Sequence, residues 1–164
     1  MIDTSSIQYL VAALNKTNLM VQHVDTQSNI LIGVSTAIFI FSVSRLESSS
    51  NLLVLVTLGV TAAVSALIGL VGLHPPRFYR KKGQKESIIF PSAIAKYKNA
   101  ESYIEVLQKD SQDFKKVSAE LSRELYNISK YYYLPKRKFY RYSRNIMLLG
   151  ILFALGTYLF ELIY

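Results

Sequence analysis

The chain has 164 residues, about half of them apolar, and a net charge of +8 at pH 7. A soluble domain of this length rarely combines a positive mean hydropathy with so many cations. Seventeen of the 19 Lys and Arg residues fall within residues 77–144, where seven acidic residues leave a net charge of +10. This separation of apolar from basic sequence predicts a membrane protein, and the absence of cysteine excludes disulfides and thiolate chemistry.

Three apolar segments are candidates for membrane spans. Residues 26–45 are uncharged up to Arg45, and residues 52–73 form the longest apolar run. Residues 146–164 form the third, interrupted only by Glu161 near its end. At about 1.5 Å per residue, each is long enough for a hydrocarbon core about 30 Å thick. Because few residues separate the first two, residues 26–74 are expected to form a transmembrane hairpin.

The rest of the chain is expected to be helical and cytoplasmic. Residues 1–25 predict an amphipathic helix, and residues 75–145 predict a basic helical segment in which Pro91 begins one helix and Asp110 or Ser111 caps a second. Their apolar stripes favour a cytoplasmic helical hairpin. The expected fold class is therefore an all-α integral membrane protein, with a C-terminal transmembrane helix at residues 146–164.

A second proline and the distribution of charge refine this expectation. Pro135 lies inside an otherwise continuous helical pattern, which predicts a kink or short break near Leu134. The strongly basic segment should stay inside the cell, with the short hairpin loop outside. This orientation places the N-terminus in the cytoplasm and Tyr164 on the outer side.

The residues needed for catalysis are sparse. His23 and His74 are isolated, with no ligand three or four residues away, so we expect no enzyme, no metal site and no cofactor. Six of the seven glycines lie in the apolar spans, which excludes a phosphate-binding glycine loop. Small residues four apart in the spans indicate close helix packing, either within the chain or between copies. These pairs are Gly59 with Ala63, Ser65 with Gly69, and Gly150 with Ala154.

Aromatic and cationic side chains alternate in residues 131–142, just before the third span. One interpretation is a polybasic patch with interfacial tyrosines that contacts anionic lipid. The other is a site for an anionic nucleotide, with tyrosine rings stacking on the base and Arg or Lys pairing with phosphate. The candidate ligand-binding residues are Arg123, Tyr126, Lys130, Tyr131, Arg137 and, before the first span, Asp25. Asp25 is alternatively the N-cap of the first span.

Several segments resemble the Pycsar effector transmembrane family of small bacterial antiphage proteins. They are the entry to the first span at residues 23–31 (HVDTQSNIL), the exit of the hairpin at residues 73–76 (LHPP), and residues 90–94 (FPSAI). The closing helix, residues 121–131 (LSRELYNISKY) continuing to residues 138–141 (KFYR), is also similar. Gln27, where the family tends to have lysine, and Pro135 depart from the pattern.

The resemblance implies a membrane effector of antiphage defence. A partner cyclase would make cyclic CMP or cyclic UMP after infection, and the effector would sense it in its cytoplasmic part and impair the membrane. It implies a multi-pass protein of the cell inner membrane, whose partners are the nucleotide and the lipid bilayer rather than nucleic acid. Homo-oligomerisation is left open.

Two other functions remain in view. A scaffolding membrane protein would use the basic segment to bind anionic lipid or a protein partner. A transporter or channel subunit is disfavoured, because the spans are expected to carry no buried charge except Glu161 near one end. Ion paths usually contain intramembrane ionisable residues.

Overall fold

The structure is a computed structural model that describes residues 4–47, 51–74 and 86–163. These residues form helices joined by short turns and contain no strand, which confirms the all-α prediction. In chain order the elements are α1 (Thr4–Arg45), α2 (Leu52–Leu73), α3 (Pro91–Ile94), α4 (Ala100–Ser111), α5 (Phe114–Asn127), the π-helix η2 (Ile128–Tyr133) and α6 (Leu134–Ile163). Eleven residues of the basic segment, 75–85, lie outside the described ranges.

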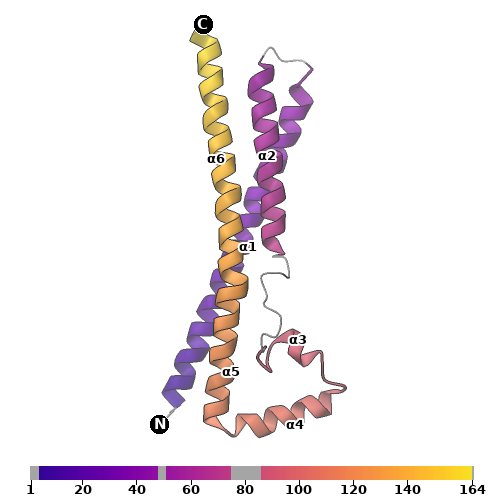
Figure 1. Cartoon of the computed structure of the whole chain (residues 1–164), viewed down its shortest axis with the longest axis vertical. Helices are drawn as coiled ribbons and strands as arrows, with labels where there is room; N and C mark the ends of the chain where they lie inside the picture. The colour runs from indigo at the N-terminus through magenta and orange to yellow at the C-terminus, as the bar shows by residue number, and fades with distance from the viewer. Residues whose placement is uncertain (1–3, 48–50, 75–85, 164) are drawn as a thin grey trace. The chain divides into compact units, whose positions relative to one another are not determined.

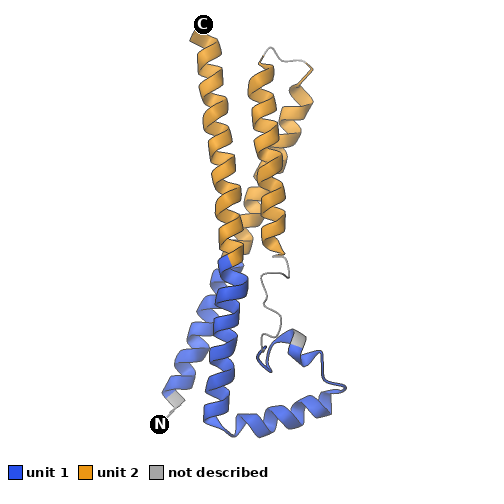
Figure 2. Cartoon of the chain, in the orientation of Figure 1, with its two compact units in different colours: residues 1–22, 77–134 blue, residues 23–76, 135–164 orange. Residues whose placement is uncertain are grey.

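The chain divides into two compact units (Figure 2). Unit 1 comprises Met1–Gln22 and Arg77–Leu134, and unit 2 comprises His23–Pro76 and Pro135–Tyr164. Both α1 and the run from α5 to α6 contribute to both units. Unit 2 therefore contains the predicted spans, and unit 1 contains most of the predicted cytoplasmic sequence.

Three helices are long and apolar enough to cross a membrane, judged by their length and composition among the described residues. The 22 residues of α2 rise about 33 Å, which matches a hydrocarbon core about 30 Å thick. In unit 2 the second part of α1, α2 and the body of α6 run side by side (Figure 1). This arrangement confirms an all-α membrane protein with a hairpin and a third, C-terminal span.

Small residues fill the contacts among the three helices of unit 2. On α2 the buried positions include Gly59, Ala62, Ser65, Gly69 and Gly72. On α1 and α6 most of the buried positions are also small, and only a few larger apolar residues such as Val24 and Met147 join them. The small ones are Ser28, Ser35, Ser42, Ser143, Gly150 and Ala154. Since lipid tails are as apolar as leucine, membrane helices associate by close backbone approach rather than by burying large side chains. Ser65 with Gly69 and Gly150 with Ala154 are thus buried within one chain, whereas Ala63 of the third pair is only half-buried.

A serine cluster joins all three helices at one level. Ser65 Oγ of α2 lies 3.1 Å from Ser35 Oγ of α1 and donates to the backbone carbonyl of Ser143 in α6 at 3.0 Å. Ser143 Oγ donates to the carbonyl oxygen of Ser65 at 2.7 Å. All three side chains are completely buried. The cluster therefore satisfies its hydroxyls internally and fixes the register of the three helices.

The N-terminal helix does not end before the first span. α1 runs without interruption for 42 residues, so Asp25 is an interior residue and the prediction that it caps the first span is wrong. The residues from Asp25 to Ser28 carry no helix breaker, and Thr26, Gln27 and Ser28 are tolerated in the helix. Continuity of the hydrogen-bonded backbone therefore overrides the local capping signal.

In unit 1, the helix predicted to begin at Pro91 is split. α3 begins there but lasts one turn, and α4 starts afresh at Ala100 with Asn99 as its N-cap, whose side chain accepts from Ser102 N–H at 3.0 Å. α5 is capped by Asp113 rather than by Asp110 or Ser111, because Asp113 accepts from the backbone N–H of Lys115 at 2.9 Å. Both corrections follow from the strong preference of Asn and Asp for N-cap positions.

The irregularity predicted near Leu134 is a π-helical segment rather than a break. η2 covers Ile128–Tyr133, directly before Pro135, and the chain remains helical on both sides. Proline lacks the N–H that an α-helix needs and clashes with the preceding turn. A π-turn accommodates the proline by shifting the hydrogen-bond pattern, and such turns are frequent at functional sites.

Candidate functional site

The predicted ligand-binding residues are divided between the two units. Arg123, Tyr126, Lys130 and Tyr131 belong to unit 1, whereas Asp25 and Arg137 belong to unit 2.

Tyr126, Lys130 and Tyr131 form one cluster at the junction of α5 and η2. The Lys130 ammonium donates to the Tyr126 hydroxyl and lies 4.9 Å from the centroid of that ring and 5.9 Å from the centroid of Tyr131. The two rings meet edge to face at 6.1 Å between centroids. The hydrogen bond to Tyr126 raises the pKa of Lys130, so its charge is secure at neutral pH. One cation beside two aromatic faces is suited to a planar, anionic ligand.

Arg123 serves a structural ion pair. Its guanidinium pairs with Glu120, one turn earlier on α5. The other oxygen of Glu120 accepts from the backbone N–H of Ile88 at 3.0 Å, which ties the segment before α3 to α5. Arg123 is therefore engaged in holding unit 1 together and is placed less openly for a ligand than Lys130.

A hydroxyl-lined cleft of about 470 Å³ lies in unit 1 between the first turns of α1 and the middle of α5. It is lined by Ser5, Ser6, Tyr9, Leu10, Ser118 and Ser122. The cleft is wide open to solvent, so a ligand held there would keep much of its surface exposed. Ser118, Ser122 and Tyr126 recur every four residues along α5, so the cleft and the tyrosine cluster share one side of that helix. Sequence reasoning missed this cleft, because the serines of α1 and α5 lie more than a hundred residues apart.

In unit 2, Asp25 is paired with Lys136. The Lys136 ammonium lies 2.7 Å from each carboxylate oxygen of Asp25, and the Lys136 side chain is only 13% exposed. This pair joins α1 to the first turn of α6. The sequence alone does not predict this pair, since 111 residues separate Asp25 from Lys136.

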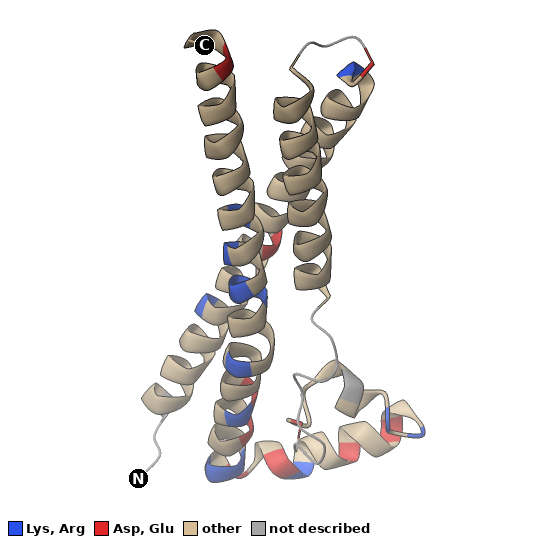
Figure 3. Cartoon of the chain, turned by 45° about the horizontal axis from the view of Figure 1, so that its top comes forward, with Lys and Arg blue, Asp and Glu red and all other residues tan. Residues whose placement is uncertain are grey.

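Arg137 follows Lys136 on the first turns of α6 and is exposed, as are Lys138, Arg141 and Arg144. Figure 3 shows the Lys and Arg positions gathered along this part of α6, whereas the following apolar turns carry none. Lys138 lies 5.7 Å from the ring of Tyr142, and Arg144 lies 5.9 Å from the ring of Tyr140. Alternating cations and tyrosines of this kind are typical of a membrane–water interface on the cytoplasmic side.

Glu124 is the most deeply buried charged residue of the candidate region, at 6% exposure. Burial raises the pKa of its carboxyl, and the neighbouring carboxylates of Glu86 and Glu120 add to the rise. No three acidic or histidine side chains among the described residues are arranged to hold a metal ion. The described part of unit 1 offers hydroxyls, aromatic rings and a cation to a ligand.

Comparison with known proteins gives one family. The chain matches the family model described as the Pycsar effector protein domain over residues 9–162. No curated protein and no solved structure matches the chain. Because the match covers nearly every residue, including the tyrosine and lysine cluster at residues 126–131, the chain belongs to the Pycsar effector family.

Proposed function

We propose that this membrane effector of antiphage defence binds a cyclic pyrimidine nucleotide with its cytoplasmic helices and then impairs the integrity of the membrane. The observation that carries the proposal is the family match over residues 9–162, since the family implies a cyclic nucleotide signal from a partner cyclase. The protein acts in this proposal by binding and conformational change, without a catalytic step of its own.

The cytoplasmic side chains of unit 1 support recognition of such a ligand. Tyr126 and Tyr131 offer aromatic faces for a base, and Lys130 offers a charge-assisted hydrogen bond to the cyclic phosphate. The serine hydroxyls of the neighbouring cleft can both donate and accept, as the edge of a pyrimidine requires. A ligand bound at this site can shift the equilibrium between two conformations of the protein only as far as its affinities for the two conformations differ.

The test is a calorimetric titration of the detergent-solubilised full chain with cyclic CMP, cyclic UMP, cyclic AMP and cyclic GMP. We expect saturable binding of one pyrimidine nucleotide and much weaker binding of both purine nucleotides. Absence of binding by all four would contradict the proposal and favour a scaffold that binds anionic lipid through the exposed cations of α6.

A charge-neutralised variant sharpens the test. Lys130→Gln should weaken the binding about tenfold, the loss typical of one charge-assisted hydrogen bond. The matched control is Lys109→Gln, which removes an exposed cation from the end of α4, away from the tyrosine pair. Equal affinities of the two variants would remove Lys130 from the site, while binding by the unmodified protein would still support a nucleotide sensor.

A further inference from the structure

The contact between α2 and α6 in unit 2 is close along most of its length. The two helices run antiparallel, with Gly72 against Phe139, Ser65 against Ser143, and Gly150 against Thr61. A Cβ atom added at Gly72 would lie 2.6 Å from Phe139 Cβ, so the backbones touch there. The last buried residue of α6 is Ala154, at 3% exposure.

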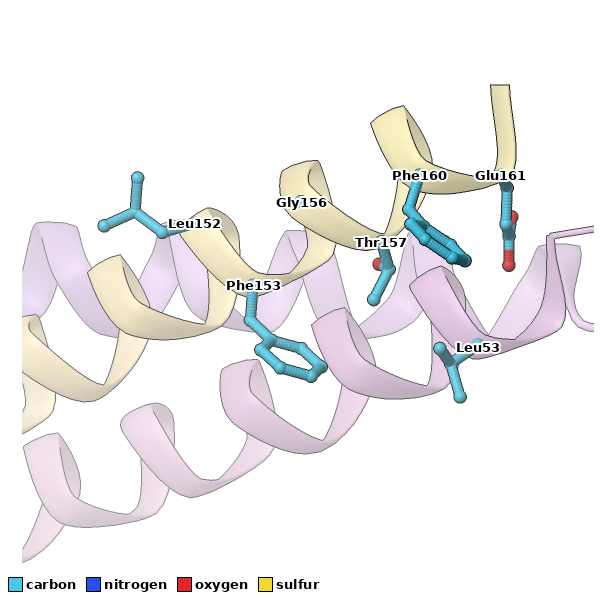
Figure 4. A pocket seen from close by; sticks show the side chains of 7 residues that line it. All are labelled: Leu53, Leu152, Phe153, Gly156, Thr157, Phe160 and Glu161. Atoms are coloured by element: carbon cyan, nitrogen blue, oxygen red, sulfur yellow. The ribbon is translucent and has the colours of Figure 1, made fainter. Parts of the chain in front are cut away.

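Beyond Ala154 the contact opens into a groove of about 330 Å³. A Cβ atom added at Gly156 would meet nothing within 4 Å, in contrast to the tight fit at Gly150. The groove is lined by Leu53, Leu152, Phe153, Gly156, Thr157, Phe160 and Glu161 (Figure 4). Its position between two apolar helices exposes it to the bilayer rather than to water.

The groove is apolar along its walls and polar at one end. Leu152, Phe153 and Phe160 are between 62% and 64% exposed. Thr157 and Glu161 stand together at the end nearer the C-terminus, and Figure 4 shows both side chains directed to the same side of α6 as the rings. Glu161 makes no ion pair with any residue that the structure describes, and it is the only charge after Arg144.

The length of the groove matches one leaflet. From Leu152 to Glu161 the helix rises about 14 Å at 1.5 Å per residue, which is about half of a hydrocarbon core about 30 Å thick. An acyl chain lying along Gly156 would therefore carry its headgroup to the level of Thr157 and Glu161. The carboxylate favours a headgroup with a hydrogen-bonding cation and disfavours one with a net negative charge.

We propose that the groove between α2 and α6 is a binding site for a phospholipid with a primary ammonium headgroup, as in phosphatidylethanolamine. One acyl chain fills the space over Gly156 between Phe153 and Phe160, and the ammonium group donates to Glu161. This inference is independent of nucleotide recognition, because it rests on unit 2 alone.

A second copy of this chain is a poorer occupant of the groove. Copies inserted with the same topology are related by an axis along the membrane normal, so equivalent residues lie at the same depth. Pairing through this face would bring two Glu161 carboxylates together, and like charges at close range repel. The carboxylate therefore argues for a cationic headgroup rather than for a symmetric dimer.

The experiment is native mass spectrometry of the full chain released from nanodiscs that contain equal amounts of phosphatidylethanolamine and phosphatidylglycerol. We expect the protein to retain the ethanolamine lipid about fivefold more than the glycerol lipid, as an ion pair of about 1 kcal/mol gives. Glu161→Gln should remove the preference, and Gly156→Leu should reduce retention of both lipids by filling the groove.

Matched controls separate the groove from general effects. Glu47→Gln neutralises an exposed carboxylate that does not line the groove, and Gly33→Leu makes the same substitution at a glycine of α1 with nothing within 4 Å. Both should retain the preference. Equal retention of the two lipids by the unmodified protein, equal loss in test and control variants, or a dimer abolished by Gly156→Leu would overturn the proposal.

Discussion

Lys136 and Asp25 show how one pair of side chains can join segments distant in sequence. The pair is partly shielded from water, and the Lys136 ammonium lies 2.7 Å from each carboxylate oxygen of Asp25. Removing one member leaves the remaining charge in a poorly solvated place, which costs more than the pair itself contributes. Asp25, which the sequence predicted to be a helix N-cap, therefore links α1 to α6 through its ion pair with Lys136.

Lys136→Met should lower the free energy of unfolding by about 2 kcal/mol. This figure lies between the losses typical of breaking an exposed ion pair and of breaking a buried one. Thermal unfolding in detergent measures this as a fall of several degrees. The exchanged double variant, Asp25→Lys with Lys136→Asp, should recover part of the loss. Lys116→Met is the control, since its partner Asp110 lies in an exposed pair and little change is expected. Equal losses in both single variants would refute this link between α1 and α6.

Glu124 makes the stability of unit 1 depend on pH. Its pKa is raised above the ordinary value of 4.5, so the folded state holds this proton more tightly than the unfolded state. Between 4.5 and the raised pKa the folded state binds more protons, and stability must fall as the pH rises through that window. Above the window the buried carboxylate is charged and its Oε2 has no hydrogen-bond partner among the described residues.

Glu124→Gln should therefore raise the unfolding temperature at pH 7.5, and the gain should vanish as the pH falls to 4.5. The exposed Glu105→Gln on α4 is the control and should not change the pH dependence. The measurement is the unfolding temperature of each variant and of the unmodified protein at half-unit intervals of pH. A gain that is independent of pH would show that the amide improves packing instead of removing a charge.

At the scale of elements, the glycines of α1 and α6 occupy two different kinds of position. Gly150 is a contact position, because any side chain there overlaps Thr61 of α2. Gly33 and Gly156 face open space. The sequence marks all of them as small residues in apolar spans, and only the arrangement of neighbouring helices distinguishes them.

Gly150→Val should separate α2 from α6, whereas Gly33→Val should be tolerated. Overpacking a close helix contact typically costs about 1–3 kcal/mol. We expect the first variant to lose its folded population in mild detergent at a temperature where the second is unchanged, as measured by size-exclusion chromatography after heating. Equal behaviour would mean that the α2–α6 contact does not determine stability.

At the scale of the whole molecule, the distribution of charge fixes the expected orientation in the membrane. From this distribution we expect the basic segment inside the cell, the hairpin loop outside, and both the N-terminus and α4 in the cytoplasm. Because the chain has no cysteine, single cysteines can report this directly.

Glu47→Cys should react with a membrane-impermeant maleimide in intact spheroplasts, and Lys109→Cys should react only after the membrane is opened. Both positions are exposed in the structure, so a difference in labelling would reflect the side of the membrane and not burial of the side chain. The reverse pattern would invert the topology and place the candidate nucleotide site outside the cell.

Sequence by itself determined the class of the protein, its three spans and its family. Apolar length, the segregation of cations and the order of short motifs are local properties of the chain, so no tertiary contact is needed to see them. The tyrosine and lysine cluster at residues 126–131 was also predictable, because helical spacing places those residues side by side.

Tertiary structure decided what depends on distant partners. Three features depend on helices that are far apart in sequence. They are the Asp25–Lys136 pair, the serine cluster of Ser35, Ser65 and Ser143, and the groove that opens at Gly156. A serine or glycine in an apolar run looks the same whether it meets a backbone, a hydroxyl or lipid. The position of the neighbouring helix decides which of these the small residue contacts, and that position follows from packing along the whole span.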